Sequence, residues 1–429
     1  MPEPSAAPSL QKTLTPLGLW AIAVGLVISG EYFGWNLGWA VAGPVGMLVA
    51  TLVVTVLYIT FIISFTELTT AIPQAGGPFA YAHRALGPLG GVVAGYATLV
   101  EFLLAPPAIA FALGSYGHFL HPAVPVLGTA VGCYVVFTII NLLGIKESAR
   151  FSLVVTVLAV AELLVFMGVL APHFRVANFL AHPVPLRLAG VLAALPVAIW
   201  FYLAIEGVAM VAEEVKEPRR TLPLGYGYGL GTLVLLALGV MVLTGGATDW
   251  RRLSHLDYPL PEALALVLGK DSPLTKFFAS IGLFGLVASF HGTIIGYSRQ
   301  VFALARGGYL PGFLAQLNGR GAPHWALVAG GGVGLLALLT GTTAQVIILS
   351  VLGALVMYIV SLVSLFALRR REPELARPFA VPGYPLVPLV ALVLAIVSLG
   401  ALVYNNLLLS GIFLVGLVLT LELFKLLKR

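Results

Sequence analysis

Ile28-Ser29-Gly30-Glu31-Tyr32-Phe33 interrupts the first long apolar segment of the chain with a glycine that is followed by a carboxylate. No lysine or arginine occurs between Lys12 and Arg84, so no basic side chain nearby in the sequence neutralises Glu31. A charge inside an apolar segment of this length is costly unless something pairs with it, which makes Glu31 a candidate functional residue. The missing partner is either a proton or a bound cation.

The composition is that of a membrane protein. Of 429 residues, 59% are hydrophobic and only 9% are charged, whereas soluble domains carry about 25% charged residues. The mean hydropathy is +1.02. A spanning helix needs about 20 mostly apolar residues. The sequence predicts an all-α membrane protein with twelve such spans, at 16–40, 45–70, 89–117, 125–143, 152–171, 188–211, 223–245, 275–299, 323–341, 343–368, 386–404 and 407–427.

Basic residues are distributed unevenly between the two sides of this topology. If residues 1–15 form a cytosolic tail, the outer loops carry only Arg175, Arg187, Arg251, Arg252, Lys270 and Lys276 of the 23 lysines and arginines. This asymmetry agrees with the positive-inside rule and predicts that both termini are cytoplasmic. The net charge of +6 then reflects cytosolic loops, and we predict no nucleic-acid partner. The mixed charges from Glu213 to Arg220 are expected to form a solvated loop that grips neighbouring loops.

A second interruption repeats the first. Ile205-Glu206-Gly207 breaks the sixth span, five spans after the first, so the second unit crosses the membrane in the opposite sense. Paired interrupted spans of this kind are typical of the central site of a transporter. We predict inverted repeats at 16–171 and 188–368, with two further spans at 386–427. The alternative is that Gly30 and Gly207 are ordinary helix-packing glycines.

Other classes of protein lack support in the sequence. The one cysteine, Cys133, excludes an intramolecular disulfide and a cysteine-rich metal site. No nucleotide-binding loop is present. A membrane enzyme would need a nucleophile motif or a histidine-rich metal site, and neither occurs. We therefore predict that the protein is not an enzyme and binds no metal.

Three motifs in the expected order resemble those of the amino acid–polyamine–organocation superfamily. They are Phe65-Thr66-Glu67-Leu68 with Ile72 to Tyr81, Trp200 to Gly207 with Ala212 to Arg220, and Ser298-Arg299 with Ala305 to Pro311. The stretches 28–36 and 198–210 are similar to the ethanolamine permease branch. The resemblance implies a LeuT-like five-plus-five inverted repeat and alternating access in a bacterial inner membrane. It implies a monomer or homodimer in the lipid bilayer and coupling to H⁺ or Na⁺, with no other cofactor.

Glu31 departs from the pattern of the wider family. Amino-acid permeases of this family usually have a Gly-Ser-Gly sequence here, and Glu31 replaces its third residue, a glycine. A substrate carboxylate would meet like charge, whereas a small amine such as ethanolamine would meet its counter-ion. An amino-acid or polyamine permease of the same fold remains the alternative.

The predicted binding residues come from the two interrupted spans and their neighbours. They are Ile28, Ser29, Gly30, Glu31, Glu101, Trp200, Phe201, Tyr202, Glu206 and Thr293, with Glu162, Glu206 and His291 as coupling candidates. The aromatic faces can attract an ammonium group by cation–π interaction, worth up to about 2 kcal/mol when desolvated. The alternatives are a protonated Glu31 bonded to backbone carbonyls, a packing role for Glu101 and the aromatic residues, and a hydrogen-bonded structural His291.

Overall fold

The computed structural model describes residues 12–143, 145–181, 184–340 and 342–427, so most of the predicted tail 1–15 lies outside it. These residues are helical and form no strand beyond a parallel bridge between Leu14 and Val215. The α-helices are α1 (Pro16–Val27), α2 (Ser29–Tyr32), α3 (Leu37–Ala71), α4 (Pro78–Leu120), α5 (Val126–Leu142), α6 (Ile145–Leu170), α7 (Val176–Phe179), α8 (Leu188–Ile199), α9 (Pro218–Ala247), α10 (Pro259–Leu268), α11 (Pro273–Ile281), α12 (Leu283–Arg306), α13 (His324–Thr340), α14 (Thr343–Arg371), α15 (Leu386–Asn405) and α16 (Leu407–Leu427). The 3₁₀ helices are η1 (Ala171–His173), η2 (Ile205–Glu214), η3 (Trp250–Arg252) and η4 (Gly312–Ala315).

Eight helices in the described part of the chain are long and apolar enough to cross a membrane. The first, fourth, sixth and ninth predicted spans correspond to shorter apolar helices, at Pro16–Tyr32, Val126–Leu142, Leu188–Ile199 and His324–Leu339. Two of these four are short because the helix is interrupted. The structure therefore confirms a multi-pass, all-helical architecture, although fewer helices reach full spanning length than the twelve predicted.

Two of the long helices contain a kink. The backbone is non-helical at Gly43 (φ 65°) in α3 and at Gly87 (φ 81°) in α4, and each glycine precedes a proline. Proline removes a backbone donor and disfavours helical backbone in the residue before it, so each glycine–proline pair interrupts the helix. The helices resume at residues 44 and 88, within one residue of the starts predicted for the second and third spans, and residues 37–40 lie in the short segment before the first kink.

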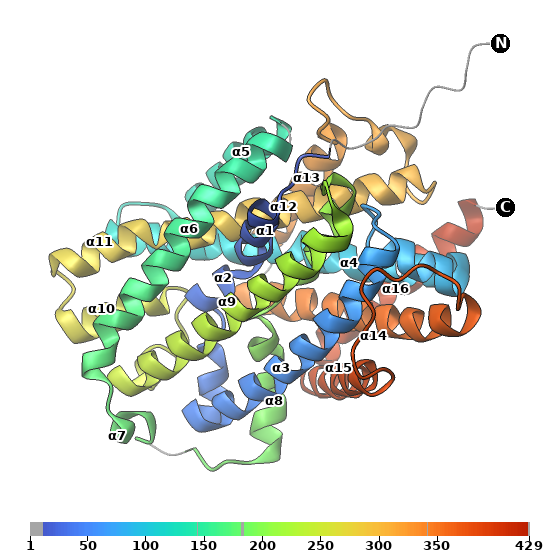
Figure 1. Cartoon of the computed structure of the whole chain (residues 1–429). Helices are drawn as coiled ribbons and strands as arrows, with labels where there is room; N and C mark the ends of the chain where they lie inside the picture. The colour runs from blue at the N-terminus through green and yellow to red at the C-terminus, as the bar shows by residue number, and fades with distance from the viewer. Residues whose placement is uncertain (1–11, 144, 182–183, 341, 428–429) are drawn as a thin grey trace, which may run out of the picture.

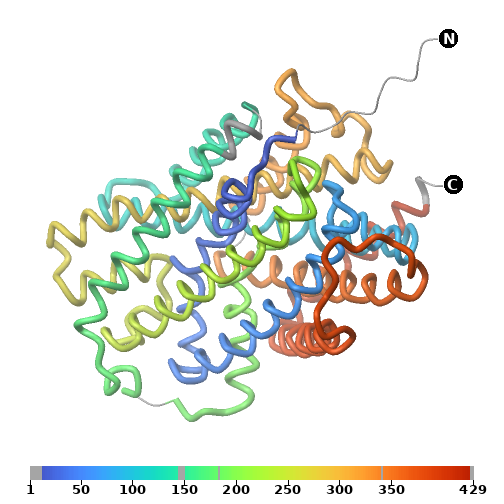
Figure 2. Tube along the Cα trace, in the orientation of Figure 1, coloured from blue at the N-terminus to red at the C-terminus, as the bar shows by residue number. Residues whose placement is uncertain are grey.

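Helix α1 lies among α6, α9 and α12, which all contact it, and α4 packs along α14. Figures 1 and 2 show α1 and α2 surrounded by other helices, with α15 and α16 outside this group. Large apolar side chains on α16 are exposed, among them Leu408 and Leu419. Glu31, Glu101 and Glu206, in contrast, are fully buried near the centre. The fold therefore encloses these three acids and turns apolar surface outward.

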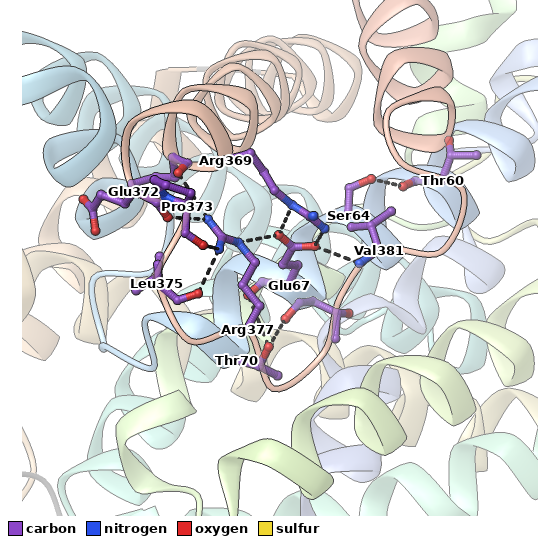
Figure 3. Close-up of polar contacts among 12 residues, drawn as sticks. Thr60, Ser64, Glu67, Thr70, Arg369, Glu372, Pro373, Leu375, Arg377 and Val381 are labelled. Atoms are coloured by element: carbon purple, nitrogen blue, oxygen red, sulfur yellow. Dashed lines mark hydrogen bonds and ion pairs between the residues drawn. The ribbon is translucent and has the colours of Figure 1, made fainter.

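A buried carboxylate ties the end of α3 to α14 and the loop that follows it (Figure 3). Glu67 is 1% exposed and accepts two hydrogen bonds from Arg369, at 2.7 and 2.6 Å, and one at 2.7 Å from the backbone N–H of Val381. Arg377 lies 3.2 Å from the same carboxylate. Paired hydrogen bonds from arginine to carboxylate are geometrically specific, so Glu67 fixes the position of residues 369–381.

We predict that Glu67→Gln destabilises the protein, because removing one partner of a buried ion pair costs about 3–5 kcal/mol. The measurement is the thermal unfolding midpoint in detergent. Glu422→Gln is the matched control, since Glu422 pairs with Lys425 in an exposed position. Equal midpoints for the two variants would contradict a structural role for the Glu67 cluster.

Candidate functional site

The first membrane segment is interrupted where the sequence places Ser29-Gly30-Glu31. Helix α1 ends at Val27, α2 is a single turn, and extended or turn residues from Phe33 to Asn36 lead into α3. Gly34 adopts a φ of 92°, which a side chain would disfavour. The Asn36 side chain donates to the carbonyls of Leu253 and Leu256, at 2.6 and 2.9 Å, and so anchors the end of this break.

The second interruption follows α8. This helix ends at Ile199, and the chain resumes as η2 at Ile205 after turns that include Ala204 at a φ of 79°. Left-handed backbone is costly for a residue with a Cβ atom, and such strain gathers at functional sites. Trp200, Phe201 and Tyr202 lie inside this break, whereas the sequence placed them before it.

The two breaks are in direct backbone contact at Gly30. A Cβ atom added there would overlap the carbonyl oxygen of Trp200 and would lie 3.0 Å from the Cα atom of Phe201. Gly207 is crowded as well, since an added Cβ atom would lie 2.9 Å from the Phe102 ring. Both glycines therefore allow close packing, which is the alternative role considered for them from the sequence. They do so, however, where the helices are interrupted.

A small cavity of about 10 Å³ lies beside this contact, roughly the space of one water molecule. It is lined by Leu26, Val27, Ser29, Ala105, Ile109, Trp200, Leu203, Ala204, Ser289 and Thr293. Ser29 and Ser289 share a hydrogen bond of 2.8 Å, and Thr293 donates to the backbone carbonyl of Ser289 at 2.9 Å. The structure is therefore closed around a site with hydroxyl groups on an otherwise apolar wall.

Only three of the predicted binding residues line this cavity, namely Ser29, Trp200 and Thr293. Phe201 instead stacks on Trp35, and the Tyr202 hydroxyl bonds to Thr55 at 2.7 Å. Ile28 and Gly30 belong to the break without lining the cavity. The lining residues that sequence reasoning missed are Leu26, Val27, Ala105, Ile109, Leu203, Ala204 and Ser289. A signal existed for Ser289, since it precedes Thr293 by four residues and so shares its helical face.

Glu31 is fully buried, and among the described residues neither carboxylate oxygen has a hydrogen-bond partner or an ion pair. Its backbone carbonyl accepts a hydrogen bond of 2.9 Å from the Trp35 indole. A buried carboxylate without a partner carries a large desolvation cost, which a proton or a cationic ligand would remove.

A second group of polar side chains surrounds Glu206. Tyr358 donates to this carboxylate at 3.1 Å, and the hydroxyls of Tyr58 and Tyr358 lie 2.8 Å apart. The Glu101 side chain is a direct neighbour of Glu206, although neither Glu101 oxygen has a well-aligned hydrogen bond. Two buried carboxyl groups and two tyrosine hydroxyls therefore form a polar group within the apolar core.

Glu162 on α6 reaches the first break from the other side. It accepts a hydrogen bond of 2.9 Å from Tyr32, and its second oxygen lies against Gly282, where α11 gives way to α12. The Tyr116 hydroxyl donates to the Tyr32 carbonyl at 3.0 Å. Glu162 therefore links α2 to a junction in the eighth predicted span.

His291 is fully buried on α12. Its Nδ1 is 3.0 Å from the Asn141 amide nitrogen, and its ring packs against Phe137 and Phe151. These contacts suit the hydrogen-bonded structural alternative, and the coupling role stays a prediction.

The first acids of the predicted solvated loop contact neighbouring segments, as expected, but they are partly or fully buried instead of solvated, whereas Lys216, Glu217, Arg219 and Arg220 are exposed. Glu214 is fully buried and bonds to Arg299 at 3.1 Å. Glu213 bonds to Arg306 at 2.5 Å and accepts from the Ala75 N–H at 2.8 Å. Both acids belong to η2, which draws them against α12 rather than leaving them in water.

A family profile described as amino acid permease matches residues 14–417. The chain belongs to this family. An uncharacterized transporter of Rhizobium meliloti (strain 1021) is 29% identical over 91% of this chain and 87% of that protein. The methylthioribose transporter of Bacillus subtilis (strain 168) is 26% identical, covering 90% and 87%. The branched-chain amino acid permease BcaP of the same organism is 24% identical, covering 76% and 74%.

Membership of the amino acid permease family makes the protein a membrane transporter of a small molecule rather than an enzyme. The two interrupted segments and the closed cavity between them are the candidate site of this permease.

We predict that Gly30→Ala lowers both the unfolding midpoint and transport, because an overpacked core costs typically about 1–3 kcal/mol and this contact is with backbone. Gly132→Ala in α5 is the control, since an added Cβ atom there meets nothing within 4 Å. Thermal unfolding and uptake into proteoliposomes measure the two effects. A Gly30→Ala protein as stable and active as the control would contradict close contact between the breaks.

Proposed function

We propose that this permease is a secondary transporter that imports a small organic amine, with ethanolamine as the substrate, by alternating access. The observation that carries the proposal is Glu31, a fully buried carboxylate beside a helix break with no hydrogen-bond or ionic partner among the described residues. A substrate with a positive charge and no carboxylate would complete this site. An α-amino acid would bring a second negative charge to it.

The proposed architecture has twelve spans with cytoplasmic termini, in a bacterial inner membrane. Residues 16–171 and 188–368 form the two LeuT-like inverted repeats, and 386–427 adds two peripheral helices. The supporting observations are the interruption after Val27, the interruption after Ile199, and their contact at Gly30. Equivalent breaks that meet at one point are expected of two inverted repeats around a central site.

Substrate binding requires the closed cavity to widen. We propose that the breaks separate, so that the ammonium group reaches Glu31 and the face of Trp200, while Ser29, Ser289 or Thr293 receives the alcohol group. Trp200 can add cation–π attraction. The carbonyl end of α1 also carries partial negative charge, which favours the same sign of ligand.

We assign coupling to Glu162 and to the Glu101–Glu206 pair. Glu162 bonds to Tyr32 in α2, so a change in its charge acts directly on the first break. Glu206 lies at the start of η2 and bonds to Tyr358 on α14, so it acts on the second break in the same way. A proton or Na⁺ at either place would be bound together with the substrate.

A second candidate is transport of a branched-chain amino acid. Leu26, Val27, Ile109 and Leu203 make most of the cavity wall apolar, which suits an aliphatic side chain. The relative BcaP is a branched-chain amino acid permease. In this case Glu31 would be protonated during binding.

The first test compares Glu31→Gln with wild type in proteoliposomes. We expect at least about a tenfold loss of ethanolamine uptake, since a charged hydrogen-bonding partner in a buried site contributes about 1.5–3 kcal/mol. Glu422→Gln, an exposed position on α16, is the control. Unchanged ethanolamine uptake by Glu31→Gln would remove Glu31 from the binding role.

Competition distinguishes the two candidate functions. We expect excess unlabelled ethanolamine to inhibit uptake of labelled ethanolamine, while alanine, leucine and putrescine do not. Uptake of labelled leucine that is inhibited by isoleucine but not by ethanolamine would establish the branched-chain alternative instead.

Imposed gradients test coupling. We expect Glu162→Gln to retain exchange of labelled for unlabelled substrate but to lose acceleration by an inward proton or sodium gradient, because the gradient acts through this carboxylate. Undiminished acceleration in the variant would place coupling elsewhere.

A further inference from the structure

Three basic side chains from three separate segments line one pocket of about 340 Å³. Lys12 precedes α1, Arg150 lies in the second turn of α6, and Lys216 follows η2. All three are exposed, and none forms an ion pair with a described acid. Three positive charges around one hollow favour an anionic ligand.

The backbone holds these charges in place. The N–H groups of Thr13 and Leu14 both donate to the Glu214 carbonyl at 2.9 Å, and the Lys216 N–H donates to the Leu14 carbonyl at 3.2 Å. Leu14 is 2% exposed and so fixes the segment against the core. The pairing keeps Lys12 and Lys216 at the same edge of the molecule.

The start of α1 adds to the attraction for an anion. Thr15 caps this twelve-residue helix and also lines the pocket. The first backbone N–H groups of a helix carry partial positive charge and favour an anion nearby.

Apolar surface leads away from the same pocket. Leu17 and Leu153 line it, and Leu17 is 58% exposed. Along α6 the exposed side chains continue with Val154 and Leu158, toward the middle of the predicted span. A ligand that fits both parts has an anionic head and a hydrocarbon chain.

We propose that this pocket, formed by Lys12, Arg150, Lys216 and Leu17, binds the headgroup of an anionic phospholipid, whose acyl chain lies along α6. The proposal rests on the proposed topology, which puts the pocket at the cytoplasmic surface of the membrane. Basic residues at that surface attract anionic lipids. The bound lipid would join the segment before α1, the start of α6 and the end of η2, and so would stabilise the closed state at the second break.

The test is native mass spectrometry of the full-length protein with phosphatidylglycerol and, separately, phosphatidylcholine. We expect the wild-type protein to retain phosphatidylglycerol in preference to phosphatidylcholine. The variant Lys12→Gln/Arg150→Gln/Lys216→Gln should lose about tenfold or more of this affinity, since each basic residue near an anionic surface contributes several-fold.

The control Arg219→Gln/Arg220→Gln/Arg320→Gln removes the same charge from exposed positions that do not line the pocket. It should bind phosphatidylglycerol as wild type does. Equal losses in both triple variants, or no loss in the first, would overturn the proposal. So would displacement of the lipid by millimolar inorganic phosphate, which would identify a soluble anion as the ligand. None of these measurements involves transport, so they would remain valid even if ethanolamine proved not to be the substrate.

Discussion

The structure depends on the approach of two interrupted segments at Gly30. Any side chain there would overlap the Trp200 carbonyl, so the first break can meet the second only because this residue lacks a Cβ atom. That contact places Ser29 and Trp200 around one cavity and brings α1, α2, α8 and η2 to a common centre. The backbone groups freed by the breaks are tolerable at membrane depth because protein covers them on every side.

Buried acids are distributed around this centre with tyrosine partners instead of basic ones. Glu162 bonds to Tyr32, and Glu206 bonds to Tyr358, whereas Glu31 has no such partner in the described structure. A tyrosine hydroxyl is neutral and can donate a hydrogen bond to a carboxylate. It therefore does not hold the carboxylate in its ionised form as a charged arginine does. The arginine-bound acids Glu67 and Glu214 lie instead at helix ends and hold neighbouring elements together. The two kinds of carboxylate therefore differ in their partners, with arginine at the helix ends and tyrosine around the centre, where we have proposed that coupling occurs.

Much of the fold follows from the sequence because apolar length and the two breaks are local features. The glycine next to a glutamate predicted both interruptions, and the shorter helices arise where they occur. What the sequence did not predict depends on contacts between distant segments. Phe201 and Tyr202 turn toward Trp35 and Thr55. Their directions are not encoded in the spacing of these residues, since a break has no helical period from which a face can be inferred. Ser289, in contrast, shares a helical face with Thr293, so its place in the cavity could have been inferred.

The near absence of space beside Trp200 affects how the permease discriminates by size. A cavity with room for one water molecule must expand around any larger guest. If the proposed amine binds there by alternating access, its entry pushes the two breaks apart and transport requires them to close again. A bulkier analogue with the same charged head would then bind but hold the breaks separated. Under the proposed function, such a compound would act as a competitive inhibitor that is not itself carried.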